Sequence, residues 1–217
     1  MTVIAPVVHL VDNDPQVLKA VARLLSAEGF RTQASQSTQE FLLHYDASIP
    51  GCVVLDLAMP GGSGLDLQQA LHDSHVDVPI VFLSGQADVP ASVRAMKDGA
   101  LDFLTKPVDA EELISAVRRG IERDERQRAI AEEDHALHLR LDKLTPRERE
   151  ILPWLVSGKL NKQIAGDLGV VEKTVKVHRS RVMEKLGVRN LADLVRLASR
   201  LHVDPPAGAP RVGPTAN

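Results

Sequence analysis

Short apolar runs recur along the first 120 residues, separated by segments of mixed composition. Each run has four or five residues; the runs are Val7–Val11, Cys52–Leu55, Ile80–Leu83 and Leu101–Leu104. Runs of this length are typical of strands that are buried on both faces of a sheet. After Asp14 the apolar residues recur instead at helical spacing, at Val17, Leu18, Val21, Leu24 and Leu25. The pattern therefore predicts that strands and helices alternate.

Helix boundaries in this region carry recognisable signals. Pro15 suits the first position of a helix, and Gly29 suits the position just after its end. Ser37-x-x-Glu40 and Asp109-x-x-Glu112 have the spacing of capping boxes, which start helices. Strand and helix alternate about five times, which predicts an α/β, doubly wound fold with a parallel five-stranded sheet. In such sheets the ligand site lies at the carboxyl ends of the strands.

The pattern from residue 144 onward is helical throughout. Thr145-Pro146-Arg147-Glu148 combines a helix cap, a proline at the first position and a capping-box glutamate, and this helix is expected to run to Gly158. Three further helices are predicted, over Lys162–Leu168, Glu172–Leu186 and Leu191–Leu201. A short helix, a glycine turn at Gly169 and a longer helix form the pattern of a helix-turn-helix motif, whose second helix enters the major groove of DNA.

Two segments lie outside these domains. Residues 121–143 are rich in charged residues and alanine and are predicted to form a linker helix. Ile130, Leu137 and Leu144 are seven residues apart, which indicates a short coiled-coil seam, but Asp134 occupies a position where that seam needs an apolar residue. A solvated linker helix is the alternative. Residues 203–217 are rich in proline and small residues, and we expect this tail to be disordered.

Charge is distributed unevenly along the chain. The 217 residues carry a net charge of −3, yet residues 1–117 carry −9 and residues 144–217 carry +6. An acidic first domain and a basic second domain indicate different partners. No stretch approaches the ~20 apolar residues that cross a bilayer, and the single Cys52 suits a reducing compartment. We therefore expect a cytoplasmic protein with no membrane partner.

Acidic residues follow the predicted strands of the first domain. Asp12 and Asp14 come after the first strand and Asp56 after the third. Carboxylates gathered at one sheet edge repel one another unless a cation lies among them, and oxygen ligands of this type suit Mg²⁺. Ser84 and Lys106 follow two further strands. A carboxylate, a divalent cation, a lysine and a hydroxyl are the groups that phosphoryl transfer needs.

These residues stand in motifs that resemble a known family. The motifs are Val11-Asp12-Asn13-Asp14, the run Leu55-Asp56-Leu57-Ala58-Met59-Pro60-Gly61-Gly62-Ser63-Gly64, then Leu83-Ser84-Gly85, and Phe103-Leu104-Thr105-Lys106-Pro107. Residues 1–120 thereby resemble the flavodoxin-like receiver domain of bacterial two-component response regulators. The resemblance implies that Asp56 is the phosphoacceptor, that Lys106 pairs with the phosphoryl group, that Ser84 moves onto it and that the Phe103 ring follows. It also implies a cis Lys106–Pro107 bond.

The metal site implied by this resemblance consists of Asp12, Asn13, Asp56 and the Ala58 carbonyl. The family usually has a second acid where this chain has Asn13. An amide oxygen can still bind Mg²⁺, but one negative charge is lost beside the metal. We therefore expect weaker Mg²⁺ binding than is usual in the family.

Residues 144–202 resemble the LuxR/FixJ (NarL-type) helix-turn-helix output domain. The matching motifs are Leu144-Thr145-Pro146-Arg147-Glu148-Arg149-Glu150, then Asn161-Lys162-Gln163-Ile164-Ala165, and Glu172-Lys173-Thr174-Val175-Lys176-Val177-His178-Arg179. By resemblance Lys176 and Val177 face bases, whereas Lys173, Thr174 and Arg181 approach phosphates. Lys162 and Ser180 complete the expected DNA-binding set. Val171 replaces the usual helix cap, and Pro153 lies inside a predicted helix, where a kink is the normal result.

Together the resemblances imply a response regulator rather than an enzyme. A sensor histidine kinase would phosphorylate Asp56 with Mg²⁺, and the chain would then bind double-stranded promoter DNA as a homodimer. The closing helix, Leu191–Leu201, is the expected dimer face, and RNA polymerase is a further candidate partner. A haloacid-type phosphatase would need an acid two residues after Asp56, where Ala58 stands. The open alternative is a dimeric DNA-binding regulator that does not depend on phosphorylation, with a degenerate receiver, as Asn13 would allow.

Overall fold

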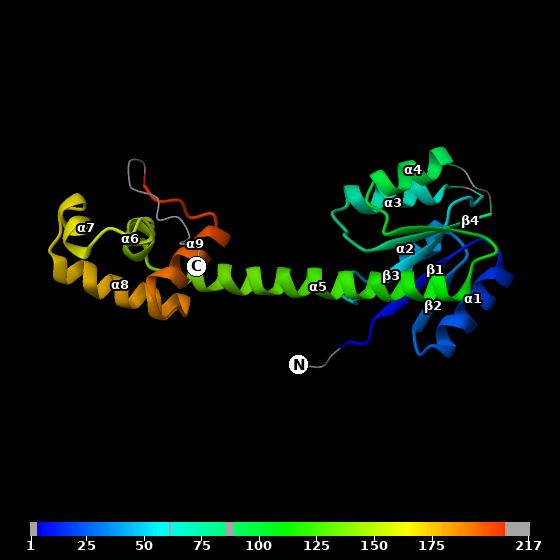
Figure 1. Ribbon diagram of the computed structural model, residues 1–217, viewed down its shortest axis with the longest axis horizontal. Coiled ribbons are helices and arrows are strands. Elements are labelled where there is room, and N and C mark those ends of the chain that lie inside the picture. Colours follow the sequence, from blue (N-terminus) through cyan, green and yellow to red (C-terminus); the bar gives the residue numbers. More distant parts are fainter. Residues whose placement is uncertain (1–3, 61, 86–88, 207–217) are drawn as a thin grey trace. The chain divides into compact units, whose positions relative to one another are not determined.

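The computed structural model describes residues 4–60, 62–85 and 89–206 and divides into two compact units (Figure 1). The α/β domain is Met1–Ala129 and the helical domain is Ile130–Asn217. Gly61 of the motif quoted above lies outside the described residues, as do residues 207–217 of the tail that we expect to be disordered. Among the residues described, no helix is both long enough and apolar enough to span a membrane.

A five-stranded parallel sheet forms the centre of the α/β domain, as predicted. Its order is β2-β1-β3-β4-β5. The strands are β1 (Val7–Val11), β2 (Arg31–Ser35), β3 (Gly51–Asp56), β4 (Ile80–Ser84) and β5 (Asp102–Thr105). Strands β1, β3 and β4 are buried along their whole length, which is why the apolar runs mark them clearly.

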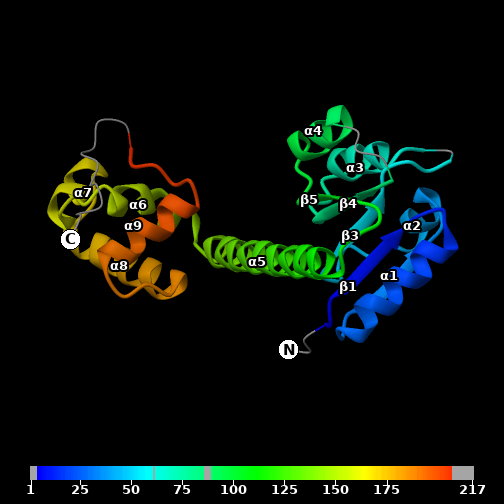
Figure 2. The ribbon, with the colours of Figure 1, turned by 45° about the vertical axis from the view of Figure 1, so that its right-hand side comes forward.

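In the described part of this domain, helices cover both faces of the sheet (Figure 2). They are α1 (Pro15–Ala27), α2 (Thr38–His44), α3 (Gly64–Asp73), α4 (Val89–Lys97) and α5 (Ala110–Asp142). Alternate residues of a strand point to opposite faces, so Cys52 and Val54 pack with α1 and α5, whereas Val53 and Leu55 pack with α2, α3 and α4. The sheet therefore has a hydrophobic core on each side.

Strand β2 was not marked by any apolar run. It is the edge strand beside β1, and of its residues only Ser35 is buried. An edge strand covered on one side needs few apolar residues, so the hydrophobic pattern contains no signal for it.

The predicted helix starts are confirmed. Asp14 caps α1 by accepting a hydrogen bond from the Gln16 N–H at 2.8 Å. Ser37 caps α2 by accepting one from the Glu40 N–H at 3.1 Å. These caps satisfy backbone N–H groups that have no partner within the helix.

Helix α5 stays in contact with the α/β domain beyond residue 121, where we expected a solvated linker. Asp124 is 2% exposed. Its carboxylate accepts hydrogen bonds from the Gly51 N–H at 2.9 Å and from Arg128 Nε at 2.7 Å. The Cys52 thiol is buried against Val117 and Gly120 of the same helix, and burial raises its pKa to about 12. The first part of the predicted linker therefore belongs to the α/β domain.

In the part of the helical domain that the structure describes, four helices follow the end of α5. They are α6 (Pro146–Val156), α7 (Asn161–Asp167), α8 (Glu172–Leu186) and α9 (Leu191–Arg200). Their buried residues form one core that includes Ile151, Ile164, Val182 and Leu194. Helix α6 continues through Pro153 for three residues.

The candidate coiled-coil seam is buried at its C-terminal end and exposed at its N-terminal end. Leu144 is 4% exposed and lies in the core of the helical domain, and Leu141 packs against that core. Asp134 pairs with Arg200 of α9 at 2.6 Å, whereas Ile130 is 51% exposed. The C-terminal end of the seam therefore packs into the core of the helical domain.

A buried carboxylate holds the start of α6. Glu148 is 1% exposed and completes the predicted capping box, because it accepts a hydrogen bond from the Thr145 N–H at 2.8 Å. It also pairs with Lys185 of α8 at 2.7 Å. This pairing with Lys185 and the bonds to Thr145 lower the pKa of Glu148 to about 2, against the opposing effect of burial.

The substitution Glu148→Gln should destabilise the helical domain in a pH-dependent manner. Glutamine keeps the capping bond but loses the charge that pairs with Lys185, which should cost about 1–2 kcal/mol at neutral pH. The native pKa is depressed from 4.5 to about 2, so the contribution is complete above pH ~4.5 and is lost as the pH falls toward 2. Urea unfolding followed by the fluorescence of Trp154, the single tryptophan, reports on this domain.

Glu150→Gln is the matched control, because Glu150 lies on the same helix and its side chain is 50% exposed. It should change stability little at any pH. A constant difference between the wild type and Glu148→Gln from pH 7 to pH 3 would contradict the role given to the Glu148 charge.

Candidate functional site

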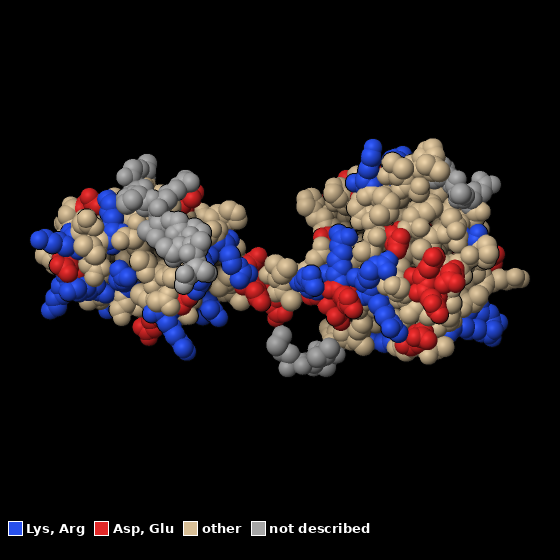
Figure 3. All heavy atoms as spheres, in the orientation of Figure 1, with Lys and Arg blue, Asp and Glu red and all other residues tan. Residues whose placement is uncertain are grey.

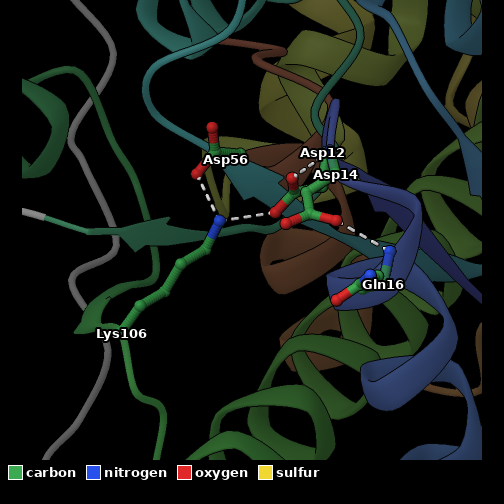
Figure 4. Close-up of polar contacts among 5 residues, drawn as sticks. All are labelled: Asp12, Asp14, Gln16, Asp56 and Lys106. Carbon is green, nitrogen blue, oxygen red and sulfur yellow. Dashed lines mark hydrogen bonds and ion pairs between the residues drawn. The ribbon is translucent and has the colours of Figure 1, made fainter.

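The acidic residues and Lys106 meet at the carboxyl edge of the sheet (Figure 4). Asp12 directly follows β1 and Asp56 ends β3, and these two strands are neighbours. Ser84 ends β4 and Lys106 directly follows β5. Because all the strands are parallel, residues at their ends lie at one edge, as the sequence predicted.

The Lys106 ammonium lies between the two carboxylates. Its Nζ atom is 2.5 Å from Asp12 Oδ2 and 2.7 Å from Asp56 Oδ1. The carboxylate side chains are 5% and 7% exposed, and that of Lys106 is 23% exposed. The Asp14 N–H donates to Asp12 Oδ1 at 2.9 Å and holds that carboxylate in place. The ammonium therefore offsets the repulsion between two buried negative groups.

Burial and charge act against each other at this site. Burial raises the pKa of Asp56, and the hydrogen bond and positive charge of Lys106 oppose that increase. Burial lowers the pKa of Lys106, but the hydrogen bonds and charges of Asp12 and Asp56 outweigh it, and the net shift is upward. Lys106 is therefore held in its cationic form.

The remaining predicted residues lie around this pair. Ser84 is 4% exposed, and its carbonyl accepts a hydrogen bond from the Lys106 N–H at 2.7 Å. The centroid of the Phe103 ring lies 6.2 Å from that of the Phe82 ring, and Phe103 is partly exposed. Asn13 and Ala58 are exposed in the loops after β1 and β3. The Lys106–Pro107 bond is cis, as the resemblance implied.

The donor atoms at this edge suit a small, hard cation. Two buried carboxylates, the Asn13 amide oxygen and the Ala58 carbonyl oxygen are all oxygen ligands, which Mg²⁺ prefers. In the part of the chain that the structure describes, no group of three carboxylate, imidazole or thiol side chains could hold a metal ion. The residues therefore fit Mg²⁺ with main-chain, amide and water ligands beside two carboxylates.

A glycine allows α3 to begin against the site. A Cβ atom added at Gly64 would lie 2.5 Å from the Asp56 carbonyl oxygen and 3.0 Å from the Phe82 ring. The Gly64 N–H donates to the Leu57 carbonyl at 2.9 Å. The absence of a side chain at Gly64 thus allows the backbone after Asp56 to turn into α3.

The second candidate site is the exposed surface of α8. Figure 3 shows lysine and arginine side chains around the α7 and α8 end of the helical domain. The predicted residues Lys173, Lys176, Val177, Ser180 and Arg181 are exposed, as is Lys162 of α7, whereas Thr174 is half-buried. On the opposite side Val175, Val182 and Leu186 are fully buried. Helix α8 is therefore anchored by one face and presents a basic face to solvent.

The geometry between α7 and α8 is that of a helix-turn-helix. Gly169, with φ +63°, makes the turn, and Arg179 of α8 donates to the Asn161 side chain at 3.4 Å. Val171 provides no side-chain cap for α8, as its sequence position indicated. Sequence reasoning missed Lys159, which lies over the Trp154 ring at 4.8 Å and pairs with Asp167 at 2.7 Å. An isolated lysine in a loop carries no signal for such contacts.

A doubly wound domain with two buried carboxylates and a lysine at its carboxyl edge, followed by a helix-turn-helix domain, defines a class of two-domain transcription regulators. Residues 8–118 match the family described as response regulator receiver domain, and residues 142–198 match bacterial regulatory proteins of the luxR family. The chain belongs to the two-component response regulators of the LuxR/FixJ type.

Individual relatives agree with this assignment over nearly the whole chain. The chain is 40% identical to the response regulator protein TodT of Pseudomonas putida, over 91% of this chain and 87% of the relative. It is 38% identical to the transcriptional regulatory protein FixJ of Rhizobium meliloti, over 88% and 94%. The solved structure of the response regulator StyR matches with a TM-score of 0.84 and 41% identity, over 90% of this chain and 99% of that chain.

Gly64→Ala should destabilise the α/β domain. The added methyl group meets backbone that cannot move aside without displacing Asp56, and overpacking of this kind costs about 1–3 kcal/mol. Gly62→Ala is the control, because its Cβ would meet only the Thr38 side chain, at an ordinary 3.6 Å. Scanning calorimetry should show a lower transition temperature for Gly64→Ala alone. Equal temperatures for the two variants would contradict the close approach.

Proposed function

We propose that the chain is switched by phosphorylation of Asp56 and then binds promoter DNA as a homodimer. A histidine kinase would supply the phosphoryl group: an Asp56 carboxylate oxygen bonds to phosphorus as the bond between phosphorus and the kinase histidine breaks. The observation that carries the proposal is the buried Asp56 carboxylate, 2.7 Å from the Lys106 ammonium and beside a second carboxylate.

Each residue of the acidic site has a part in this transfer. Asp12, Asp56, Asn13 and the Ala58 carbonyl would hold Mg²⁺, which when bound neutralises charge on the phosphoryl oxygens. Lys106 already contacts Asp56 and supplies a second positive charge. The Ser84 hydroxyl would bind a phosphoryl oxygen, and the Phe103 ring would change its position as Ser84 moves.

Promoter binding is assigned to the basic face of α8. Lys176 and Val177 would face base edges, with Ser180 beside them, and Lys162, Lys173, Thr174 and Arg181 would approach phosphates. Two half-sites about one helical turn apart would match a dimer, with α9 as the candidate dimer face. RNA polymerase is the candidate partner at the promoter. On this proposal the chain regulates transcription and turns over no separate substrate.

A regulator that ignores phosphorylation is the second candidate. Asn13 favours it, because this residue removes one negative charge from the metal site. Such a protein would bind DNA with the same affinity whether or not a phosphodonor is present.

Two variants separate phosphorylation from DNA binding. Asp56→Asn should take up no phosphoryl group from acetyl phosphate and should lose the gain in DNA affinity that phosphorylation gives the wild type. Lys176→Ala should keep phosphoryl uptake but bind its promoter DNA at least ~5-fold more weakly, because a base contact is worth about 1–3 kcal/mol. Phosphate-affinity gels and fluorescence anisotropy with promoter DNA recovered by genome-wide footprinting measure the two properties.

The same DNA affinity for phosphorylated and unphosphorylated wild type would favour the second candidate. Phosphoryl uptake by Asp56→Asn would show that another residue accepts the group.

Asn13→Asp should strengthen Mg²⁺ binding. A unit charge about 4 Å from another contributes about 1 kcal/mol even in water, and more for a divalent ion, so we expect a gain of at least ~5-fold in affinity. Calorimetric titration with MgCl₂ measures it. Gln16→Asp is the control, because it adds an exposed charge on α1 outside the metal set. Equal affinity of Asn13→Asp and the wild type would contradict the reason given for weak binding.

A further inference from the structure

Helix α4 is held loosely along its length. All nine of its residues are described, and among them only Ala95 is buried. Its large apolar residues Val89, Val93 and Met96 are 66%, 47% and 46% exposed. Few buried contacts mean that packing alone contributes little to the position of this helix. Its position must depend on contacts at particular points.

One such point is a buried glutamine of the neighbouring helix α3. Gln68 is 5% exposed. Its Nε2 atom donates to the Ala95 carbonyl at 3.1 Å and to the Asp98 carbonyl at 3.1 Å. Figures 1 and 2 both show α3 and α4 side by side. A single side-chain amide therefore connects the two helices through carbonyl groups at the end of α4.

These carbonyls belong to the turn that ends α4. The Ala100 N–H donates to the Ala95 carbonyl at 3.0 Å and the Gly99 N–H to the Met96 carbonyl at 3.2 Å, with Gly99 at φ +92°. This is a Schellman turn, which closes the helix at a defined residue. Gln68 thus binds the part of α4 that has a fixed backbone conformation.

Ala95 and Ala100 bury their side chains in the core beneath this turn, but its solvent side is not packed. Lys97, Asp98 and Gly99 are exposed and border a pocket of about 880 Å³ that Gln68 also lines. The Gln68 Oε1 atom is buried and has no hydrogen-bond partner among the described residues. The Gln68 amide is therefore buried although its NH₂ group is hydrogen-bonded and its oxygen is not. A buried acceptor without a partner costs free energy, so the two bonds that the NH₂ group donates are the reason to keep a glutamine at this position.

The two ends of α4 lie at opposite edges of the sheet. The helix starts after β4, whose last residue is Ser84 at the edge of the acidic site, and ends before β5 begins at the other edge. We propose that Gln68 is a positioning residue that fixes the C-terminal end of α4, so that phosphorylation moves the N-terminal end about this point. The part that concerns phosphorylation rests on the proposed function, and the part that concerns the fixed turn does not.

Gln68→Met tests the proposal, because methionine has a similar length and no amide. Gln69→Met is the matched control: Gln69 is the next residue of α3, is exposed and bonds only to Asp73 among the described residues. Gln68→Glu is a second variant of the same shape that has no N–H donor at neutral pH. All are made in the full chain.

Hydrogen exchange of the unphosphorylated proteins tests the fixed turn. The Gly99 and Ala100 amides should lose at least ~10-fold of their protection in Gln68→Met and Gln68→Glu, with protection of the β4 amides unchanged, and should keep it in Gln69→Met. Unchanged protection of the turn in both Gln68 variants would overturn the proposal, whether or not the protein responds to phosphorylation.

The response to acetyl phosphate tests whether the N-terminal end of α4 moves about the fixed turn. In the wild type and Gln69→Met, phosphorylation should change exchange in the first turn of α4 and leave the last turn unchanged. In Gln68→Met both turns should change, and the gain in DNA affinity should fall at least ~5-fold although Asp56 is still phosphorylated. A residue with only a structural role would lower the melting temperature and leave that gain intact, which would overturn the proposal. A phosphorylated wild type with no gain in DNA affinity would instead refute the proposed function.

Discussion

The contact of one ammonium group with two buried carboxylates determines how the acidic site is organised. Asp12 and Asp56 end neighbouring parallel strands, so the fold brings two negative charges together at a place where water reaches only a small part of either. Lys106 reaches them from the end of a strand two positions away from β3, and it balances a charge that the sheet alone would leave unpaired. The two carboxylates suit a magnesium ion, and the ammonium suits the anionic oxygens of a phosphoryl group. Because the two carboxylates need positive charge beside them, they can contact the Lys106 ammonium or a magnesium ion.

The sequence was informative where burial is complete. Strands β1, β3 and β4 are buried along their whole length and are apolar except for His9 and the residues at strand ends, and the acids that follow them lie where the pattern of strands placed them. The edge strand β2 left no such trace, because one of its sides faces solvent. The burial and hydrogen-bond partners of Asp124 and Gln68 could not be predicted from the sequence either. Each is a polar residue buried by a backbone partner far away in the chain, and only the folded geometry shows which N–H or carbonyl group it meets.

The sequence alone also could not show which basic residues of the helical domain pair with acids. Several of its basic residues are engaged within the domain: Lys185 pairs with Glu148, Lys159 with Asp167, Arg149 with Asp142 and Arg200 with Asp134. The net charge of +6 over residues 144–217 already counts Glu148 and Asp167 but omits Asp134 and Asp142, so it overstates the positive charge that a polyanion would meet. Among the described residues, two basic side chains of α8 pair with a carboxylate: Lys185 with Glu148, and Lys176 with the exposed Glu172 one turn away. Such a weak surface pair is easily exchanged for a base or a phosphate.

The chemistry of Cys52 has a practical consequence. It is the one cysteine of the chain, its thiol is closed off between β3 and α5, and its pKa of about 12 leaves almost no reactive thiolate at neutral pH. The folded chain therefore behaves toward alkylating reagents as if it had no cysteine. A cysteine introduced on the surface, for example on the exposed side of α4, would carry a spin label or fluorophore at that position alone, without removal of the native residue.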